Sequence, residues 1–453
     1  MSELAVPDGV LAVLETLWSS GFGAYLVGGG VRDTLLGRSV PGDWDVATSG
    51  RPEEVKQALP AGRYENRFGT VTLDVAPYTV EITTFRRDHQ YADHRRPDSV
   101  TFTDSLDEDL ARRDFTVNAI AWGREPTQGA AHFEDPTNGM ADVQARLLRA
   151  VGEPAKRFDE DGLRLLRAAR FAGQLGFEIE PATRTGMTDK AEVVRWVSQE
   201  RVGGELRRMV AANPPSVAFV VLDQTGVLTH ALPELATQRG VAQDKLPGMD
   251  LWAHSLATLD AAARIDPDNE PLRLAALLHD VGKPSTFADG HFVGHDAEGA
   301  RMAAELLARL AFPRREIEPI AALIGNHMFN YEPRWSGAAV RRFIRRVGRA
   351  RVDDLLMLRA ADNVGSGLAP DAGRLAELRR RIDDELRSNP PLSLADLAVR
   401  GDDLTRELKI RPGPVVGRVL ERLLRLVIAD PAQNRPDLLF EHARDWLKRD
   451  ERR

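Results

Sequence analysis

The sequence predicts an α+β protein, with a small antiparallel or mixed sheet in an N-terminal domain and an all-helical remainder. Three observations favour this class. Short β-prone runs bounded by glycine and proline are found in the first 140 residues. After them, apolar residues recur at helical spacing. Ala, Leu, Arg and Glu, which favour helices, are abundant.

Length and composition limit the function classes. A chain of 453 residues predicts three or four domains. The net charge of −7 means that nucleic acid would have to bind local basic patches. The absence of cysteine excludes disulfides, thiol catalysis and Cys-type zinc sites. No 18-residue apolar run and no signal-peptide pattern occur, so we expect a soluble, cytoplasmic protein without a membrane partner.

The head begins with a helix predicted over residues 6–20, packed under the sheet. Residues 24–47 then predict strand, glycine turn, helix, loop and strand. Gly28, Gly29 and Gly30 lack the Cβ atoms that would keep a backbone away from a phosphate. The free N–H groups of the following helix would point at the same place.

The second strand of this unit carries Asp43 and Asp45, which share one face at i and i+2 spacing. Two adjacent carboxylates repel each other unless a cation lies between them. A glycine run alone usually forms a turn, and two spaced aspartates are common on surfaces. Their combination in one strand–turn–helix–strand unit predicts a site for Mg²⁺ and a nucleoside triphosphate.

Further head elements are a helix over residues 52–59 and strands over residues 69–73 and 79–85. Alternation in the last strand places Glu81 on the face opposite its apolar neighbours, which usually means exposure to solvent. Residues 86–104 are polar and poorly periodic, and this pattern predicts a surface loop.

The glycine-to-aspartate unit resembles the nucleotidyltransferase motif of the class II tRNA nucleotidyltransferase and poly(A) polymerase family, G-G-x-V-R-D-x-L-L-G, a short loop, then D-x-D. The matching residues are Gly28, Gly29, Val31, Arg32, Asp33, Leu35, Leu36, Gly37, Asp43 and Asp45. The resemblance implies a head over residues 1–140 in which Asp43 and Asp45 hold Mg²⁺ and Arg32 contacts phosphate. It also implies a third carboxylate, for which Glu81 is the candidate.

Two further head segments match the family. Its CCA-adding and A-adding members carry a flexible loop needed for the terminal A, and the matching residues here are Tyr91, Asp93, Arg95, Arg96 and Pro97. A second motif, linked to the ribose of the incoming nucleotide, is matched by Arg112, Arg113, Asp114 and Asn118. Asp and Asn can bind a 2′-hydroxyl and Arg can bind phosphate, although the residue types alone favour a surface ion-pair cluster.

Residues 141–244 are predicted to form a helical neck. Glu160, Asp161 and Arg164 match the family motif E-D-x-x-R, and Asp161 and Arg164 are expected to share a helix face. Spacing alone favours an ordinary salt bridge. The resemblance implies instead that a carboxylate acceptor and a guanidinium donor select CTP and ATP. Arg167 continues this ridge and could meet phosphates, and residues 200–210 match a weaker motif that supports the helix.

Residues 245–365 carry a second constellation in the order of HD-type metal phosphohydrolases. Its members are His254, His279, Asp280, His295, His327 and Asp362. One buried histidine would usually be structural, but this ordered set predicts one or two ions such as Ni²⁺, Mn²⁺ or Co²⁺. Some CCA-adding enzymes carry such a domain with phosphatase and cyclic phosphodiesterase activity.

The basic segment 341–351 holds six arginines and predicts an amphipathic helix. Its charged face is either simply solvated or contacts an RNA backbone. The tail, residues 366–453, is helical in pattern and resembles the C-terminal part of bacterial family members, on the tRNA-binding side.

The prediction for the whole chain is template-independent addition of CCA, from CTP and ATP, to the tRNA 3′ end by two-metal nucleotidyl transfer, with a separate HD phosphohydrolase activity. Two alternatives share the chemistry: an A-adding enzyme that follows a separate CC-adding enzyme, and a poly(A) polymerase. A third alternative, from another class, is an HD phosphohydrolase whose head only binds nucleotide or RNA.

Overall fold

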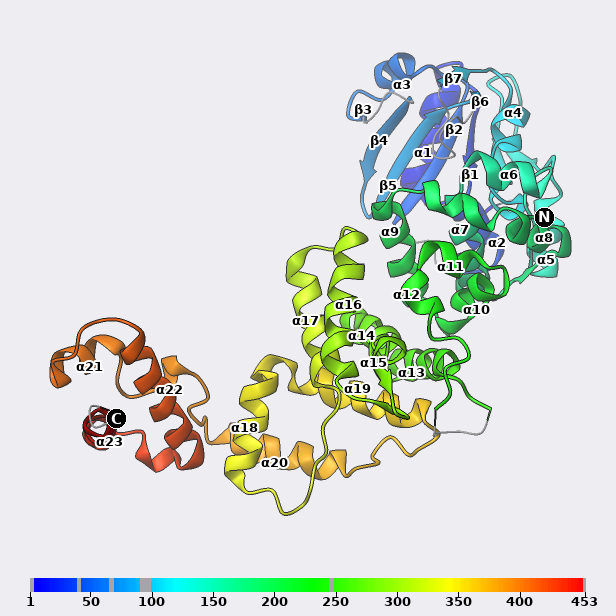
Figure 1. Cartoon of the computed structure of the whole chain (residues 1–453). Helices are drawn as coiled ribbons and strands as arrows, with labels where there is room; N and C mark the ends of the chain where they lie inside the picture. The colour runs from blue at the N-terminus through cyan, green and yellow to red at the C-terminus, as the bar shows by residue number, and fades with distance from the viewer. Residues whose placement is uncertain (1–3, 39–41, 65–68, 90–98, 244–247, 451–453) are drawn as a thin grey trace. The chain divides into compact units, whose positions relative to one another are not determined.

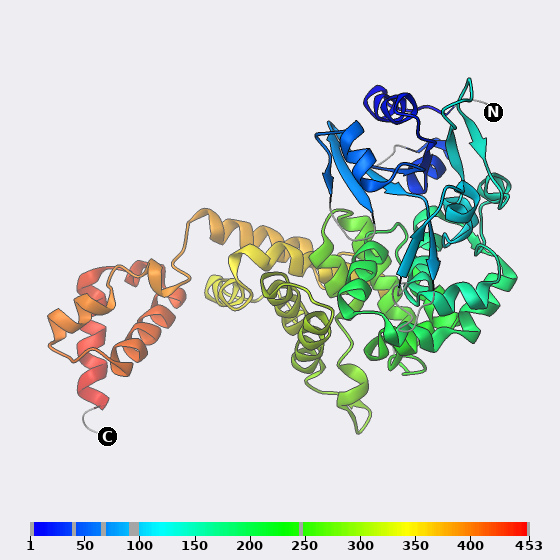
Figure 2. The same ribbon diagram turned by 90° about the horizontal axis from the view of Figure 1, so that it is seen from above.

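The computed structural model confirms the α+β class, with its main sheet in the head and helices dominating the rest (Figures 1 and 2). It describes residues 4–38, 42–64, 69–89, 99–243 and 248–450. The chain divides into two compact units, residues 1–236 with 309–311, and residues 237–308 with 312–453. Within the described residues, no helix is long and apolar enough to cross a membrane.

The head sheet is mixed, as predicted. Its strand order is β3-β4-β5-β2-β1-β8-β9, and only the β2–β5 pair is parallel. Buried side chains including Tyr25, Phe85 and Leu110 form a core against it. The strands are β1 (Ala24–Val27), β2 (Asp43–Thr48), β3 (Arg63–Tyr64), β4 (Thr70–Val75), β5 (Tyr78–Thr84), β8 (Ala121–Arg124) and β9 (His132–Glu134).

The predicted head helices are present as α1 (Asp8–Ser19), α2 (Gly29–Leu35) and α3 (Pro52–Ala58). The apolar face of α1 buries Val10, Leu14 and Leu17 because these residues recur at helical spacing. Two short helices follow in the second motif, α4 (Leu106–Ala111) and η1 (Thr116–Asn118).

The prediction that residues 86–104 form only a surface loop is wrong at both ends. β6 (Arg86–His89) pairs with β7 (Ser99–Phe102) as an antiparallel ribbon. Hydrogen bonds between paired strands satisfy the backbone N–H and C=O groups whatever the side chains are. A ribbon of polar residues can therefore form without the apolar alternation by which a strand is recognised in a sequence. The matched loop residues Tyr91, Asp93, Arg95, Arg96 and Pro97 lie outside the described residues.

The neck is helical apart from one short parallel strand pair, β10 (Leu147–Leu148) with β11 (Glu178–Ile179). The helix expected to continue past Asp161 is interrupted there, between α6 and α7. The neck helices are α5 (Gly139–Ala145), α6 (Pro154–Glu160), α7 (Leu163–Leu175), α8 (Pro181–Asp189), η2 (Ala191–Trp196), α9 (Gln199–Val210), α10 (Ser216–Gln224), α11 (Val227–Ala231) and α12 (Pro233–Ala236).

The second unit opens with helices that surround the predicted metal ligands, and α13 packs against both α14 and α19. A small hairpin, β12 (Phe287–Ala288) with β13 (His291–Phe292), interrupts them. The helices are α13 (Leu251–Ile265), α14 (Glu270–Leu278), α15 (Lys283–Thr286), α16 (His295–Arg309), α17 (Arg314–Asn326) and α19 (Val352–Gly365).

The predicted basic helix is α18 (Gly337–Val347), which buries Val340, Phe343 and Ile344. It ends earlier than predicted because Gly348 adopts φ +90°, and η3 (Arg349–Arg351) follows. The tail helices, orange to red in Figure 1, enclose an apolar core of their own. The remaining helices are α20 (Leu375–Arg387), η4 (Leu394–Asp396), α21 (Gly401–Leu408), α22 (Pro414–Ala429), η5 (Pro431–Gln433) and α23 (Pro436–Asp450).

Candidate active site and candidate metal centre

Strand β2 presents the two predicted carboxylates on one face. Asp43 and Asp45 are exposed, whereas Trp44 between them is 1% exposed and faces the opposite way. Trp44 packs so closely on α2 that a Cβ at Gly30 would lie 2.8 Å from its ring. In the parallel register Asp45 stands beside Glu81, so the three carboxylates share one face of the sheet.

The turn before α2 requires glycine at its first position. Gly28 has φ +75°, and a Cβ there would lie 2.8 Å from Asp45 Oδ2. A Cβ at Gly29 would meet only Arg32 Nη2, at 3.6 Å. The glycine turn and the aspartate strand are therefore in direct contact, as the combined motif predicted.

A cleft of about 440 Å³ opens beside this turn. It brings together most of the predicted residues of the head with one from the neck. The predicted residues that line it are Gly28, Gly29, Arg32, Asp43, Asp45, Arg113, Asp114, Asn118 and Arg167. The neck also contributes Arg170, Phe171 and Arg208, so the cleft lies between α2, β2 and helices α7 and α9.

The electrostatics of Asp45 suit a cation. Although part of its surface meets solvent, the surrounding protein removes enough water to raise the pKa of Asp45 above its ordinary value. Arg113 and Arg167 act in the opposite direction, and the charge of Asp43 raises the pKa further. Oxygen ligands that repel each other in this way are suited to Mg²⁺, so the residues present fit that ion.

Arg32 is held inside the head rather than extended into solvent. Its guanidinium donates to Asp33 Oδ1 at 2.9 Å and to Asn118 Oδ1 at 2.6 Å, and its side chain is 7% exposed. These bonds join the first and second sequence motifs. Arg32 therefore also organises the wall of the cleft, a role that its motif position alone did not predict.

Two further aspartates, Asp114 and Asp109, hold nearby arginines in place through ion pairs. Burial opposes ionisation of Asp114, but Arg167 and Asn118 outweigh it and hold the pKa of Asp114 well below its ordinary value. Arg167 Nε donates to Asp114 Oδ2 at 2.7 Å. The buried Asp109 accepts from Arg112 at 2.6 Å and from Arg113 at 3.2 Å.

Sequence reasoning missed Asp109. Its helical spacing to both arginines, i,i+3 and i,i+4, was the available signal.

A smaller recess of about 270 Å³ adjoins the cleft and shares Arg113, Asp114 and Arg167 with it. Of the remaining predicted residues, Arg112, Asp161 and Arg164 line this recess. Glu81 and Glu160 line neither space among the described residues.

The prediction that Asp161 and Arg164 share a helix face is wrong. Asp161 has extended backbone angles, φ −145° and ψ 107°, between α6 and α7. At this break Gly162 allows the backbone of Val193 to approach closely, because a Cβ on Gly162 would lie 2.7 Å from the carbonyl oxygen of Val193. The Asp161 carboxylate accepts from Leu163 N, at the first residue of α7, at 3.0 Å. A glycine within a helical pattern weakens the expectation of a continuous helix, and the motif match concealed that signal.

Separate partners hold the two side chains. Arg201 of α9 donates to both oxygens of Asp161, whereas Arg164 pairs with Glu160 and donates to the carbonyl oxygens of Arg157 and Arg112. Elsewhere on α9, the buried Glu205 accepts from Arg170 at 2.6 Å. Residues 200–210 therefore hold the segment around Asp161 and helix α7 through ion pairs that the sequence did not specify.

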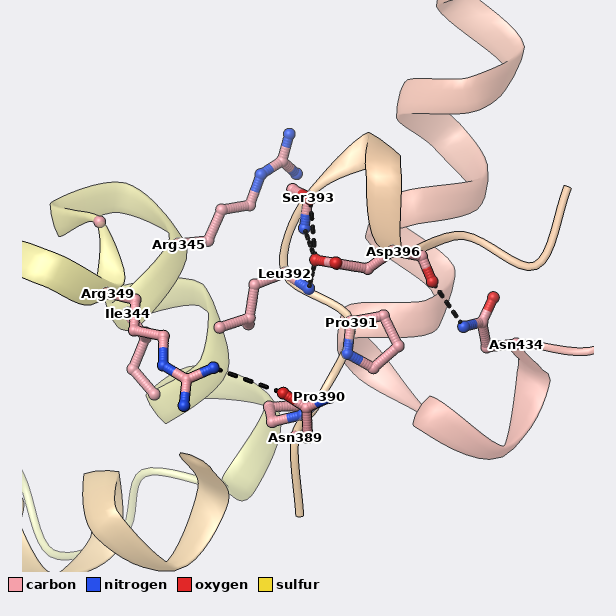
Figure 3. Close-up of a pocket in the computed structure, with 11 residues that line it drawn as sticks. Ile344, Arg345, Arg349, Asn389, Pro390, Pro391, Leu392, Ser393, Asp396 and Asn434 are labelled. Atoms are coloured by element: carbon pink, nitrogen blue, oxygen red, sulfur yellow. Dashed lines mark hydrogen bonds between the residues drawn. The ribbon is translucent and has the colours of Figure 1, made fainter. Parts of the chain in front are cut away.

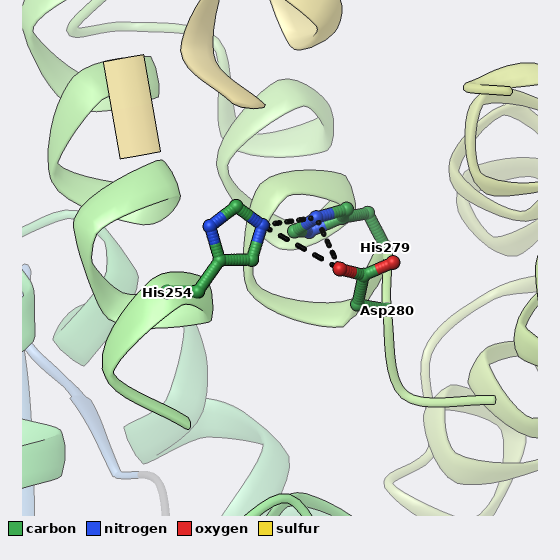
Figure 4. A group of neighbouring side chains, drawn as sticks. All are labelled: His254, His279 and Asp280. Atoms are coloured by element: carbon green, nitrogen blue, oxygen red, sulfur yellow. Dashed lines mark hydrogen bonds and ion pairs between the residues drawn. The ribbon is translucent and has the colours of Figure 1, made fainter. Parts of the chain in front are cut away.

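The six predicted HD residues gather in the second unit, and all are buried. His254 Nε2 lies 3.1 Å from His279 Nε2, and His279 Nε2 lies 3.1 Å from Asp280 Oδ2 (Figure 4). His254 Nε2 also lies 3.2 Å from Asp362 Oδ1. On the other side, Asp280 Oδ1 lies 3.4 Å from His295 Nε2 and 3.6 Å from His327 Nε2. Asp280 is therefore common to two sets of three ligand atoms.

Backbone carbonyls fix the imidazole orientations. Nδ1 of His279, His295 and His327 bonds to the carbonyl oxygens of Ala276, Phe292 and Ile324, respectively. Donation from Nδ1 leaves a lone pair on each Nε2, directed at the centre of the cluster.

The donor set fits a metal. Burial lowers the pKa of His279 and that of His295, and both shifts favour the neutral imidazole that binds metals. His295 Nε2 is buried without a hydrogen-bond partner in the described part of the chain. Lys283, which sequence reasoning missed, donates to Asp280 at 2.7 Å.

Comparisons with known proteins match the parts of the chain that carry the two candidate sites. Residues 24–149 match the poly A polymerase head domain, residues 176–239 the probable RNA and SrmB-binding site of polymerase A, and residues 251–366 the HD domain. The class is thus a nucleotidyltransferase with a polymerase A-type head, followed by an RNA-binding segment and an HD domain.

Particular relatives narrow this class. A CCA-adding enzyme of Geobacillus thermodenitrificans (strain NG80-2) is 33% identical over 443 residues, covering 96% of this chain and 95% of that protein. One from Lactobacillus helveticus (strain DPC 4571) is 42% identical over 234 residues, which are 51% of this chain and 57% of that protein. The chain belongs to the family of CCA-adding enzymes.

Solved structures share the fold. The crystal structure of Bacillus stearothermophilus CCA-adding enzyme in complex with CTP has a TM-score of 0.69 at 27% identity, covering 99% of this chain and 100% of that chain. Thermotoga maritima CCA-adding enzyme complexed with tRNA has a TM-score of 0.58 at 20% identity, covering 97% and 96%.

Proposed function

We propose that this protein adds CCA to the 3′ end of tRNA, taking CTP and ATP without a nucleic-acid template. The observation that carries the proposal is the contact between the Gly28 turn and Asp45 at a cleft that adjoins a base-sized recess. The cleft proposed to bind the triphosphate therefore adjoins the recess proposed to bind the base, and both are lined by Arg113, Asp114 and Arg167. A tRNA substrate places the activity in the cytoplasm.

In this mechanism Asp43 and Asp45 hold Mg²⁺, with Glu81 as the third carboxylate on the same sheet face. When bound, Mg²⁺ neutralises triphosphate charge and favours ionisation of the attacking 3′-hydroxyl. The Gly28–Gly29 backbone and Arg32 receive phosphate oxygens, because no side chain blocks their approach at the turn. Arg113 and Arg167 supply further positive charge at the cleft wall.

Base choice follows from complementary hydrogen bonding in the recess. Cytosine and adenine each present an exocyclic amino group beside a ring nitrogen that accepts. Asp161 accepts from the amino group, and Arg164, paired with Glu160, donates to the ring nitrogen. Asp114 and Asn118 are placed to bind the ribose, and Arg112 forms part of the recess wall.

For the second unit we propose a phosphohydrolase activity at the HD cluster. Its four histidines and two aspartates hold one or two ions, with Ni²⁺, Mn²⁺ and Co²⁺ as candidates. Such an ion, when bound, activates water for attack on phosphorus. Lys283 is placed to hold Asp280 in position, and the backbone carbonyls keep the imidazoles directed inward.

Basic residues of the second unit support tRNA binding by the tail and its neighbour α18. Arg342 and Arg346 of α18 and Arg425 of α22 line one groove, and none of them has a carboxylate partner in the described regions. Such arginines bind phosphate backbone through charge rather than sequence.

A recess of about 640 Å³ lies at the C-terminal end of α18 (Figure 3). Arg349 there donates to Asn389 Oδ1 at 3.4 Å. Asp396 accepts from the backbone N–H groups of Leu392 and Ser393, and its charge offsets part of that of Arg349.

The proposal is tested by removing the carboxylates of the head. Asp43→Ala combined with Asp45→Ala is expected to lower AMP transfer from ATP to tRNA ending in CC at least about 1,000-fold, because catalysis of this reaction depends on charge stabilisation. Circular dichroism and the metal content of the HD cluster should be unchanged. Retained transfer would refute the site assignment.

A further inference from the structure

One aromatic ring lies among the arginines of the cleft. It belongs to Phe171 of α7, which is 5% exposed and lines the cleft. Three guanidinium carbon atoms lie near the centroid of this ring: that of Arg170 at 4.0 Å, that of Arg32 at 5.1 Å and that of Arg167 at 5.3 Å. A cation within about 6 Å of an aromatic centroid is attracted by the electron-rich face of the ring. A single side chain therefore attracts three cations that line the same cleft.

The ring of Phe171 has a fixed position. Phe115, which is fully buried, meets it edge to face, with the centroids 5.9 Å apart and the ring planes at 86°. This arrangement is one of the two that aromatic pairs favour. Phe115 and Arg32 come from the head, whereas Phe171 comes from the neck, and both segments lie in one compact unit. The ring therefore fixes the position of a head arginine relative to helix α7.

The arginines need such a contact because they repel one another. Burial lowers the pKa of Arg170 below its ordinary value; Glu205 acts in the opposite direction, and the charge of Arg167 lowers the pKa further. Each guanidinium also pairs with a carboxylate, which offsets its positive charge: Arg32 with Asp33, Arg167 with Asp114 and Arg170 with Glu205. An aromatic ring differs from a carboxylate in that it attracts a cation and carries no net charge. Contact with the ring thus holds the guanidiniums together while leaving their charge available to an anion.

We propose that Phe171 is a positioning residue for triphosphate binding: its ring gathers the three guanidiniums into one cationic surface that receives the phosphates of CTP and of ATP alike. The inference rests on the proposed function. It adds Arg170 to the arginines that bind phosphate. It also assigns to Phe171 an effect on the phosphates and not on the choice of base, because among the described residues Phe171 does not line the recess that holds Asp161 and Arg164.

The first test measures the Kd of CTP, of ATP and of inorganic tripolyphosphate, each with MgCl₂, by isothermal titration calorimetry. Phe171→Leu keeps an apolar side chain but removes the ring. We expect it to raise all three Kd values by a similar factor of about tenfold, because several cation–π contacts are lost together. The KM for CTP and that for ATP in the transfer assay should rise by the same factor. The preference for CTP over UTP should stay as in the wild type.

A second test separates the attraction by the ring from its packing. Phenylalanine that carries one, two or three ring fluorine atoms is incorporated in place of Phe171, since fluorine withdraws electron density from the ring face and changes the side-chain volume little. The Kd for tripolyphosphate is expected to rise stepwise with the number of fluorine atoms. This series also decides the question if Phe171→Leu does not fold, as judged by circular dichroism.

Phe158→Leu is the matched control. Phe158 is fully buried in the same compact unit, and among the described residues it lines neither the cleft nor the recess. The substitution should lower the free energy of unfolding and leave the Kd for tripolyphosphate unchanged.

A Kd that stays constant across the fluorine series, or a loss confined to one nucleotide, would overturn the inference. Wild-type protein that transfers neither CMP nor AMP to tRNA would instead refute the proposed function. Normal transfer by the wild type, with a constant Kd across the series, would refute only the role of Phe171.

Discussion

At the scale of single residues, other side chains hold those that line the cleft and its recess: Asp109 binds Arg112 and Arg113, and Arg201 binds Asp161. Asp43 and Asp45 stand on one strand face because alternation in a strand is a local property. The relation of Asp161 to Arg164 was mispredicted because a helix break depends on a close tertiary approach, here of Gly162 to Val193. For Arg201, the motif match at residues 200–210 indicated the supporting segment, but the partner Asp161 lies 40 residues away and no local pattern identifies it.

Asp109 provides a prediction about pH at this scale. Burial opposes its ionisation, but Arg112 and Arg113 outweigh burial and lower the pKa of Asp109 below its ordinary value of 3.8. The stabilisation is therefore complete above about pH 4 and is lost as the pH falls through the lowered pKa of the folded state. Asp109→Asn should reduce the free energy of unfolding by about 2 kcal/mol at pH 7, and by less near pH 3.

Urea unfolding of wild type and variant at pH 7, 4 and 3 measures this difference. Glu305→Gln serves as a control, since Glu305 forms an exposed i,i+4 pair with Arg301 whose loss should leave the free energy of unfolding close to that of the wild type. A gap between wild type and Asp109→Asn that widens on acidification would contradict the assigned direction of the shift.

At the scale of elements, periodicity located the main helices and strands, whereas pairing and boundaries were predicted less well. The apolar spacing of α1 and α18 was sufficient because each helix buries a continuous stripe. The β6–β7 ribbon escaped prediction because polar strands are recognisable only from their partner. Arg341 also departs from the expected basic face: it is buried and donates to the carbonyl oxygens of Ile428 and Ala429.

The strand–turn–helix unit gives a prediction for Gly28. Gly28→Ala should lower the free energy of unfolding by about 1–3 kcal/mol, because an alanine at φ +75° is strained and its Cβ would meet Asp45 Oδ2 at 2.8 Å. Chemical denaturation measures this loss. Gly29→Ala is the matched control for stability, since its Cβ would make only an ordinary contact with Arg32. Equal stability of the two variants would contradict the geometry described for the turn.

At the scale of the whole molecule, the two sites lie in separate compact units and should be separable by mutation. His279→Ala combined with Asp280→Ala should remove bound transition metal, because Asp280 is common to both sets of ligand atoms. Nucleotide addition to tRNA should stay within about threefold of wild type, an estimate based on the additivity of effects at sites that share no partners. Elemental analysis of purified protein and the transfer assay measure the two outcomes.

His291→Ala is the control for the HD variant, since His291 lies on the adjacent hairpin and is exposed. Its metal content should equal that of the wild type. Unchanged metal in the His279–Asp280 double variant would defeat the assignment of the HD cluster.

The central claim is that one cleft, with one adjoining recess, adds both C and A in order. The most direct test incubates the full chain with tRNAs ending at the discriminator base, at C or at CC, each with one labelled triphosphate. The account predicts CTP incorporation on the first two acceptors and ATP incorporation on the third, stopping after one A. ATP incorporation on CC-ended tRNA without CTP incorporation on any acceptor would contradict full CCA addition and leave an A-adding enzyme.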